Sequence, residues 1–126
     1  MPVLGIGIDV CKVERIAESL ARFGERMERR LFTADELAYC RQHQDPLPHL
    51  AARFAAKEAT SKALGTGIAG GIGWTQIEVV QPGGRVPTLR LSGAALERFT
   101  SLGATKSHLS LSHDGGLGVA CVVLES

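Results

Sequence analysis

The sequence predicts an α+β domain in which one central helix packs on an antiparallel sheet. Residues 53–64 repeat with helical periodicity and gather alanines on one narrow face, which would let the helix backbone lie close to a sheet. Near the C-terminus, residues 107–113 alternate polar and apolar side chains, and residues 117–124 are almost wholly apolar. These two stretches predict a hairpin whose second strand is central and buried on both faces.

The N-terminal half is expected to supply one strand and three helices. Gly5 and Gly7 interrupt the first apolar run, as in a buried strand that another backbone approaches closely. Thr33 and Glu36 have the spacing of a capping box, so a short helix should begin there. The expected elements are a strand at 3–10, an amphipathic helix at 11–23 that Gly24 stops, a short helix at 33–43, and the central helix from about 49 to 64, which Gly65 ends.

The C-terminal half is expected to add a second hairpin and a short helix. The expected elements are a strand at 74–80, its hairpin partner at 87–91, a helix from Ser92 to about Leu102 with Ala95, Leu96 and Phe99 facing inward, and the two strands at 107–113 and 117–124. Residues 1–126 are expected to form a single domain, because a chain of this length supports one core.

Composition argues against several classes of function. A net charge of +1 and an aromatic content of 5% give neither the basic surface nor the stacking platform of a nucleic-acid binder. No segment has the pattern of a membrane span or a signal peptide, so no membrane partner is expected. Cys11, Cys40 and Cys121 lack the spacing of a metal site, and their odd number favours a reducing cytoplasm over a disulfide framework.

Two carboxylates are candidate ligands of a metal ion. Glu58 lies between Lys57 and Lys62 on the polar face of the central helix, and this arrangement suits a magnesium ion that carries a phosphate substrate. The alternative is a solvated helix face with a Glu58–Lys62 ion pair. Asp9 lies where the first strand gives way to a helix, so it either caps that helix or binds a metal.

Three other features of the sequence each have two interpretations. Arg15, Arg22 and Arg26, interleaved with glutamates, form either a mixed-charge surface or a docking face for an acidic protein. The glycines at 65–73 are either a flexible helix exit or a backbone nest for phosphate. His113, at the end of a strand, is either a hydrogen-bonded rim residue or part of a site.

Two motifs are specific in combination. Residues 7–16 read GIDVCKVERI, with Gly-x-Asp and then an arginine six residues after the aspartate. Residues 53–63 read RFAAKEATSKA, with Lys-Glu-Ala and a lysine four residues after the glutamate. Together they resemble the holo-[acyl-carrier-protein] synthases, the small class of phosphopantetheinyl transferases. The Gly65–Gly67 exit and the Ser-His-Asp of the last hairpin are also similar, so the resemblance covers nearly the whole chain.

The resemblance implies the 4′-phosphopantetheinyl transferase fold and an enzyme of fatty acid biosynthesis. The phosphopantetheine arm of coenzyme A would move to a serine hydroxyl of apo acyl carrier protein, with release of adenosine 3′,5′-bisphosphate. The implied site residues are Asp9 and Glu58 as magnesium ligands, Lys62 and Lys57 on the coenzyme A phosphates, and Arg53, Gly65, Thr66 and Gly67 around the nucleotide. Glu58, a metal-bound water and His113 remain alternative bases for the attacking hydroxyl.

The resemblance also implies partners. Arg15, Arg22 and Arg26 would face the acidic carrier protein, and the small class forms homotrimers with the pocket between neighbouring subunits. Cys11 stands where the larger two-domain transferases have a second acid. A neutral thiol is a poor magnesium ligand, so water would fill that coordination position. Thr60 is more polar than the residue expected there, which affects only local packing.

Two other functions stay open at this point. The chain could be a non-catalytic module that binds a nucleotide or a carrier protein with the same fold, although the presence of both Asp9 and Glu58 argues against this. It could also be a magnesium-dependent hydrolase of a nucleotide diphosphate.

Overall fold

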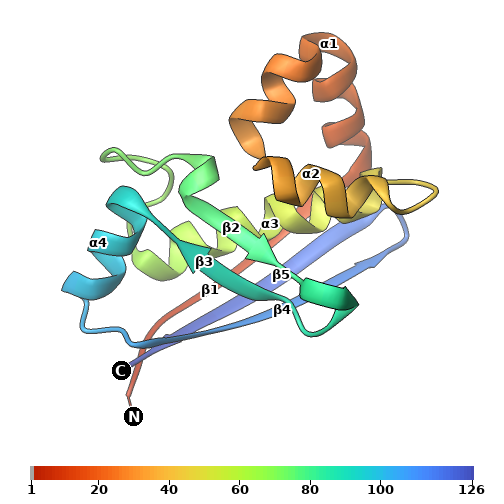
Figure 1. Cartoon of the computed structure of the whole chain (residues 1–126). Coiled ribbons are helices and arrows are strands. Elements are labelled where there is room, and N and C mark those ends of the chain that lie inside the picture. The colour runs from red at the N-terminus through yellow and green to blue at the C-terminus, as the bar shows by residue number, and fades with distance from the viewer. Residues whose placement is uncertain (1) are drawn as a thin grey trace.

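A computed structural model of the chain describes residues 2–126. Its strands and helices follow the expected order along the chain (Figure 1). The elements are β1 (Val3–Lys12), α1 (Val13–Leu31), α2 (Ala34–Arg41), α3 (Leu47–Leu64), the 3₁₀ turn η1 (Trp74–Gln76), β2 (Ile77–Val80), the 3₁₀ turn η2 (Pro82–Gly84), β3 (Thr88–Leu91), α4 (Gly93–Ser101), β4 (Lys106–Asp114) and β5 (Leu117–Glu125).

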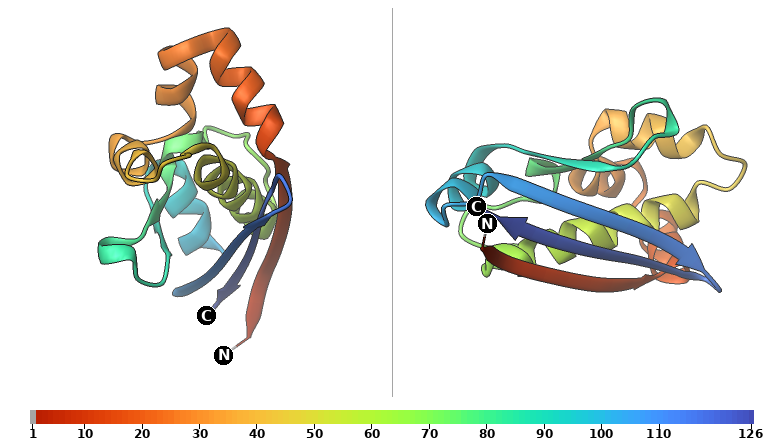
Figure 2. Two further views of the ribbon diagram at one scale, coloured as in Figure 1. Left: turned by 90° about the vertical axis from the view of Figure 1, so that its right-hand side faces the viewer. Right: turned by 90° about the horizontal axis from the view of Figure 1, so that it is seen from below.

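Strands β1, β5 and β4 form an antiparallel sheet in that order, with β5 in the centre as predicted. Helix α3 lies along one face of this sheet, as the two views of Figure 2 show. The β2–β3 hairpin, α2 and α4 lie on the other side of α3 (Figure 2). The predicted α+β fold with a central helix on an antiparallel sheet is therefore confirmed.

The helix and the sheet meet at backbone distance. A Cβ atom at Gly5 or Gly7 of β1 would overlap the carbonyl oxygen of Ala63 or Ala59 in α3, and one at Gly118 of β5 would overlap the backbone at Ala51 and Ala52. The alanine face of α3 therefore packs against glycines, as the sequence predicted. This contact fixes which residues of β1 and α3 are neighbours.

Two parts of the N-terminal half differ from the prediction. Strand β1 continues to Lys12, so Asp9 lies within the strand, and the N-cap of α1 makes no side-chain hydrogen bond. Asp9 is therefore not a helix cap. Gly24 adopts φ 64° and ψ −150°, which interrupts the helical geometry of α1. Figure 1 shows the chain turning back near this point, so the predicted stop is real although a second helical segment follows.

Two details of the C-terminal half also differ. Residues 74–76 form a 3₁₀ turn rather than the start of a strand, and β2 begins only at Ile77. Ala95 of α4 is buried as expected, whereas Leu96 is 45% exposed. The capping box at Thr33 and Glu36 is present as predicted, and Gly65 ends α3 in the left-handed conformation.

The face of the sheet opposite α3 is apolar and open. Ile6 and Ile8 of β1 are 65% and 60% exposed, and no other element of residues 2–126 covers them. Pairing places Val123 beside Ile6 and Cys121 beside Ile8 on the same face. The prediction that β5 is buried on both faces is therefore wrong for the single chain, because only alternate residues of this strand are buried.

A substitution at Gly7 tests the backbone contact. Gly7→Ala should lower the free energy of unfolding by about 2 kcal/mol or more, because the new methyl group must displace the α3 backbone and overpacked cores typically lose about 1–3 kcal/mol. Denaturant unfolding at one protein concentration measures the change.

Gly73→Ala is the matched control. Gly73 has an ordinary extended conformation, and nothing lies within 4 Å of the position its Cβ would take. Equal stability of the two variants would contradict the proposed role of the β1–α3 contact.

Candidate active site on two sheet edges

Asp9 faces the central helix. It pairs with Ala120 in the row of β1 that points to α3, between the outward-facing Ile8 and Val10. Its Oδ1 accepts a hydrogen bond of 2.9 Å from Lys62 Nζ of α3, and the same ammonium donates to the Ile8 carbonyl at 3.0 Å. Residues that are far apart in the sequence thus meet at the β1 edge of the sheet.

Glu58 shares this site with Asp9. Burial raises the pKa of the Glu58 carboxyl above its ordinary value and the negative charge of Asp9 raises it further, while Lys62 and Arg15 oppose the shift. Two carboxylates that repel each other next to an ammonium group provide hard oxygen donors of the kind that a divalent cation such as Mg²⁺ binds. The remaining described residues add no further ligand, since no group of three or more His, Cys, Asp or Glu is placed to hold a metal.

Cys11 lies next to the carboxylates and is almost fully buried. Burial and the charges of Asp9 and Glu58 raise the pKa of its thiol, although Arg15 acts in the opposite direction. The thiol is therefore neutral near pH 7, which makes Cys11 an unsuitable ligand for a hard cation, as the sequence suggested.

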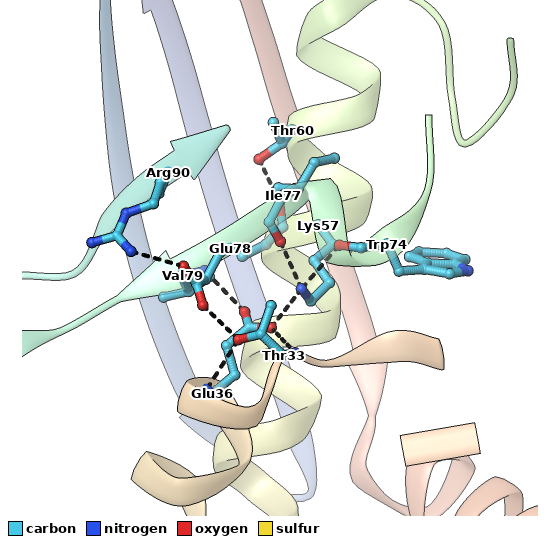
Figure 3. Close-up of polar contacts among 10 residues, drawn as sticks. Thr33, Glu36, Lys57, Thr60, Trp74, Ile77, Glu78, Val79 and Arg90 are labelled. Atoms are coloured by element: carbon cyan, nitrogen blue, oxygen red, sulfur yellow. Dashed lines mark hydrogen bonds and ion pairs between the residues drawn. The ribbon is translucent and has the colours of Figure 1, made fainter. Parts of the chain in front are cut away.

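Lys57 does not fit its expected role on a phosphate. Its side chain is 0% exposed, and its three donors contact Glu36 Oε1 at 2.7 Å, the Trp74 carbonyl at 3.1 Å and the Ile77 carbonyl at 2.6 Å (Figure 3). A buried ammonium with every donor in use cannot also bind a substrate. The helical wheel placed Lys57 on a polar face, but α2 and β2 cover that face.

Glu36 is the partner that sequence reasoning missed. One oxygen accepts from Lys57 and from the Thr33 backbone N–H, and the other accepts from the Val79 N–H at 2.9 Å (Figure 3). The capping box was visible in the sequence, but its second function of binding Lys57 and β2 depends on tertiary contacts. The buried pair thereby ties α2, β2 and η1 to the turn of α3 that also carries Glu58.

A separate pocket lies at the β4 edge of the sheet. It has a volume of about 310 Å³ and is bordered by Arg53, His49, Gln81 and His113, with the hydroxyls of residues 110 and 112 nearby. No aspartate or glutamate is among the described residues that line it. The pocket therefore has the chemistry of an anion site.

Arg53 is built into this pocket. Its side chain is only 2% exposed, its Nη2 donates to Gln81 Oε1 at 3.0 Å, and its guanidinium lies 4.3 Å from the centre of the Tyr39 ring. Its Nε is buried without a hydrogen-bond partner. The permanent positive charge of this buried guanidinium favours an anion in the pocket that it lines.

The expected site residues are thus divided between two edges. Asp9, Glu58 and Lys62 gather at β1, whereas Arg53 and His113 lie at β4, and β5 separates the two edges. Within one chain, His113 does not lie beside the carboxylates, so it does not form a single cluster with them.

The Gly65–Gly67 segment does not form a free phosphate nest. The backbone N–H of Gly65 donates to the Lys62 carbonyl, and those of Thr66 and Gly67 donate to the Ser61 carbonyl. These donors satisfy the end of α3 and are not available to an anion. Thr66 does line a cavity of about 500 Å³ against α4.

The candidate docking arginines lie on α1. Arg15, Arg22 and Arg26 are all exposed, and Arg22 lies 5.2 Å from the ring centre of Phe23, which is itself exposed. Arg15 also borders a cavity of about 230 Å³ with Phe54 and Trp74, whose rings stack at 4.9 Å. This surface continues from the carboxylate pair, because the charge of Arg15 acts on Glu58.

Comparison with known proteins agrees with this architecture. Residues 5–121 match the 4′-phosphopantetheinyl transferase superfamily. The chain is 49% identical over 124 residues to a holo-[acyl-carrier-protein] synthase of Trichlorobacter lovleyi, covering 98% of each protein. The crystal structure of holo-[acyl-carrier-protein] synthase from Neisseria meningitidis superposes with a TM-score of 0.87 at 34% identity, covering 99% of this chain and 100% of that one.

A structure with a bound molecule is also similar. Holo-[acyl-carrier-protein] synthase of Helicobacter pylori in complex with coenzyme A gives a TM-score of 0.83 at 31% identity, over 95% of this chain and 99% of that one. Fold and site define a small α+β protein with a carboxylate pair and an anion pocket. The chain belongs to the 4′-phosphopantetheinyl transferase superfamily. Within that superfamily, the proteins to which the chain is similar are named holo-[acyl-carrier-protein] synthases.

The buried and exposed lysines of α3 predict different stabilities. Lys57→Met should lower the free energy of unfolding by about 3–5 kcal/mol, because it leaves the Glu36 carboxylate buried without its cation. Lys62→Met removes an ion pair whose lysine is exposed to solvent and should cost much less. Denaturant unfolding of both variants measures the difference, and equal losses would show that the Lys57–Glu36 pair has no special structural role.

Proposed function

We propose that the chain transfers the 4′-phosphopantetheine group of coenzyme A to a serine hydroxyl of apo acyl carrier protein and releases adenosine 3′,5′-bisphosphate, with Mg²⁺. The observation that carries the proposal is the meeting of Asp9, Glu58 and Lys62 at the β1 edge. The relatives named holo-[acyl-carrier-protein] synthase and the relative crystallised with coenzyme A support the reaction and the donor. Fatty acid biosynthesis is the pathway that such a carrier serves.

Asp9 and Glu58 would hold the magnesium ion. Two carboxylates suit Mg²⁺, which takes one or two protein ligands and completes its shell with water and phosphate oxygens. When bound, the ion neutralises charge that develops on the transferring phosphoryl group.

Lys62 and Glu58 would act directly on the substrates. Lys62 is half-exposed and binds only Asp9 and a carbonyl, so its ammonium can turn to a phosphate oxygen of coenzyme A. Glu58 is the chain's own carboxylate beside that position, and in the metal-free chain burial and the charge of Asp9 raise its pKa. A bound Mg²⁺ would lower the basicity of the same carboxylate, so Glu58, a metal-bound water and His113 are all candidate acceptors of the serine proton.

The carrier protein would dock on α1. Arg15, Arg22 and Arg26 present exposed guanidinium groups on one helix, and an acidic partner supplies the opposite charge. Of these three arginines, Arg15 is the one whose charge lowers the pKa of the Glu58 carboxyl. A carrier bound along α1 would bring its serine toward the carboxylate pair.

We propose that three chains assemble into a homotrimer through the open face of the sheet. Ile6, Ile8 and Val10 form an exposed apolar row, and exposed apolar patches of this kind mark interaction surfaces. In a closed ring, the β1 edge of one subunit can meet the β4 edge of the next. The carboxylate pair and the Arg53 pocket would then bind two ends of one coenzyme A molecule.

The three free cysteines of the described residues agree with a location in the cytoplasm.

Carrier modification tests the function. Incubation with apo acyl carrier protein, coenzyme A and Mg²⁺ should add the mass of one phosphopantetheine to the carrier, as mass spectrometry would detect. Asp9→Asn and Glu58→Gln should each reduce turnover by about 10²-fold or more, because each removes a charge that would hold the cation at the phosphoryl group. Full activity in either variant would exclude the proposed metal ligands.

Other outcomes point to the alternatives. Binding of coenzyme A without carrier modification would identify a binding module, and cleavage of coenzyme A in the absence of carrier would identify a hydrolase.

Mixed trimers test the division of the site between subunits. Asp9→Asn damages the β1 edge and Arg53→Met damages the β4 edge, so each variant alone should be inactive. Co-expressed subunits should recover about one quarter of wild-type activity, because roughly a third of the sites in mixed trimers combine two undamaged edges. Light scattering checks that both variants assemble. No recovery in confirmed mixed trimers would place the whole site in one chain.

A further inference from the structure

Three histidines from different elements form a column beside the Arg53 pocket. The rings of His43, after α2, and His49, in the first turn of α3, stack with centres 3.6 Å apart and an interplanar angle of 22°. His113 of β4 meets His49 edge-on, with ring centres 4.9 Å apart. Their sequence spacing gave no indication of this contact, because the fold alone brings the three segments together.

The column belongs to a site made for an anion. His49 and His113 line the pocket together with Arg53, whose guanidinium carries a permanent positive charge. The other polar lining groups are hydroxyls and the Gln81 amide, and no described carboxylate faces the pocket. Stacked imidazoles do not converge on a cation, and no described group of three or more ligands is placed to hold a metal.

Charge around His49 disfavours its protonation in the free protein. Burial lowers the pKa of His49, and the neighbouring His43, His113 and Arg53 lower it further, with Asp45 of the α2–α3 loop acting in the opposite direction. The Tyr39 ring of α2 packs on His43 and on Arg53. A bound anion would reverse this balance, because its negative charge favours the protonated form of His49.

We propose that His49, supported by the stacked His43, is a phosphate-binding residue that takes up a proton when the Arg53 pocket binds a phosphate group of the substrate. This inference rests on the proposed use of coenzyme A. It makes the affinity of the pocket depend on pH, with neutral His49 as the resting state and an imidazolium–phosphate pair at His49 as the bound state.

The sign of the pH dependence follows from linkage. A bound phosphate raises the pKa of His49 above its lowered value in the free protein. The affinity for phosphate that protonated His49 adds is therefore complete below the pKa of His49 in the free protein. It is lost as the pH rises through the pKa of His49 in the phosphate-bound protein. Within that window the affinity changes by about tenfold for each unit of difference between the two pKa values.

Calorimetry on the whole protein tests the inference. Coenzyme A is titrated between pH 6 and 8 in buffers of different ionisation enthalpy, which reports the protons taken up on binding. The wild type should take up a proton and bind about tenfold more weakly at the upper pH. His49→Phe, which keeps a ring in the stack, should show neither effect; unchanged uptake in this variant would overturn the proposal.

Two further variants sharpen the result. His43→Phe removes an ionisable neighbour that lowers the pKa of His49, so His49 of the free protein should be protonated up to a higher pH and the proton uptake near neutral pH should shrink. His108→Asn is the control. The His108 Nε2 atom lies 2.9 Å from Glu125 Oε1, and His108 does not line the pocket, so its loss should leave the proton uptake unchanged.

Inorganic phosphate separates this inference from the proposed function. If the chain neither binds nor uses coenzyme A, the proposed function fails, whereas proton-linked binding of inorganic phosphate that His49→Phe abolishes still supports the pocket. If coenzyme A is used but its binding shows no proton uptake at any pH in the window, the inference about His49 fails and the proposed function stands.

Discussion

The rest of the structure depends on the backbone contact between α3 and the sheet. Because Gly5 and Gly7 have no side chains, the helix lies directly on β1, and this closeness lets a carboxylate on a strand and a carboxylate on a helix share one site. A metal ligand must be held to within a few tenths of an ångström, and rigid elements in direct contact provide that accuracy better than loops. The glycines are thus part of the site without touching a substrate.

The opposite side of α3 is held by charge rather than by close packing. Lys57 and Glu36 form an ion pair with no exposure to solvent, and their remaining hydrogen-bonding capacity is taken up by the backbone of α2, η1 and β2. Apolar residues can often replace such a pair without loss of stability, so its value lies in directional bonds. These bonds fix the rotation of α3 about its axis, and Glu58 is the next residue along the helix.

The sequence alone allowed the central helix and the order of the strands to be predicted, because periodicity and glycine placement lie within short segments. The resemblance carried by two motifs assigned Asp9 and Glu58 to one metal site, and that metal site stays a prediction. Sequence reasoning failed for Lys57, since a helical wheel cannot tell which polar side chain another element will cover. Sequence reasoning also missed the unpartnered Arg53 Nε and the histidine column. The members of the column, His43, His49 and His113, come from three different segments of the chain. Contacts between distant segments leave no periodic signal in a single sequence.

The two chain ends lie side by side at one end of the sheet (Figure 1), where the Ser126 N–H donates to the Pro2 carbonyl at 3.1 Å. Asp9 lies about 20 Å further along β1, at roughly 3.3 Å per residue, and His113 lies toward the far end of β4. An extension at either end would therefore project away from both edges that carry polar groups. Purification tags, fluorescent reporters or a tethered second domain attached at either end would thus lie away from Asp9 and His113.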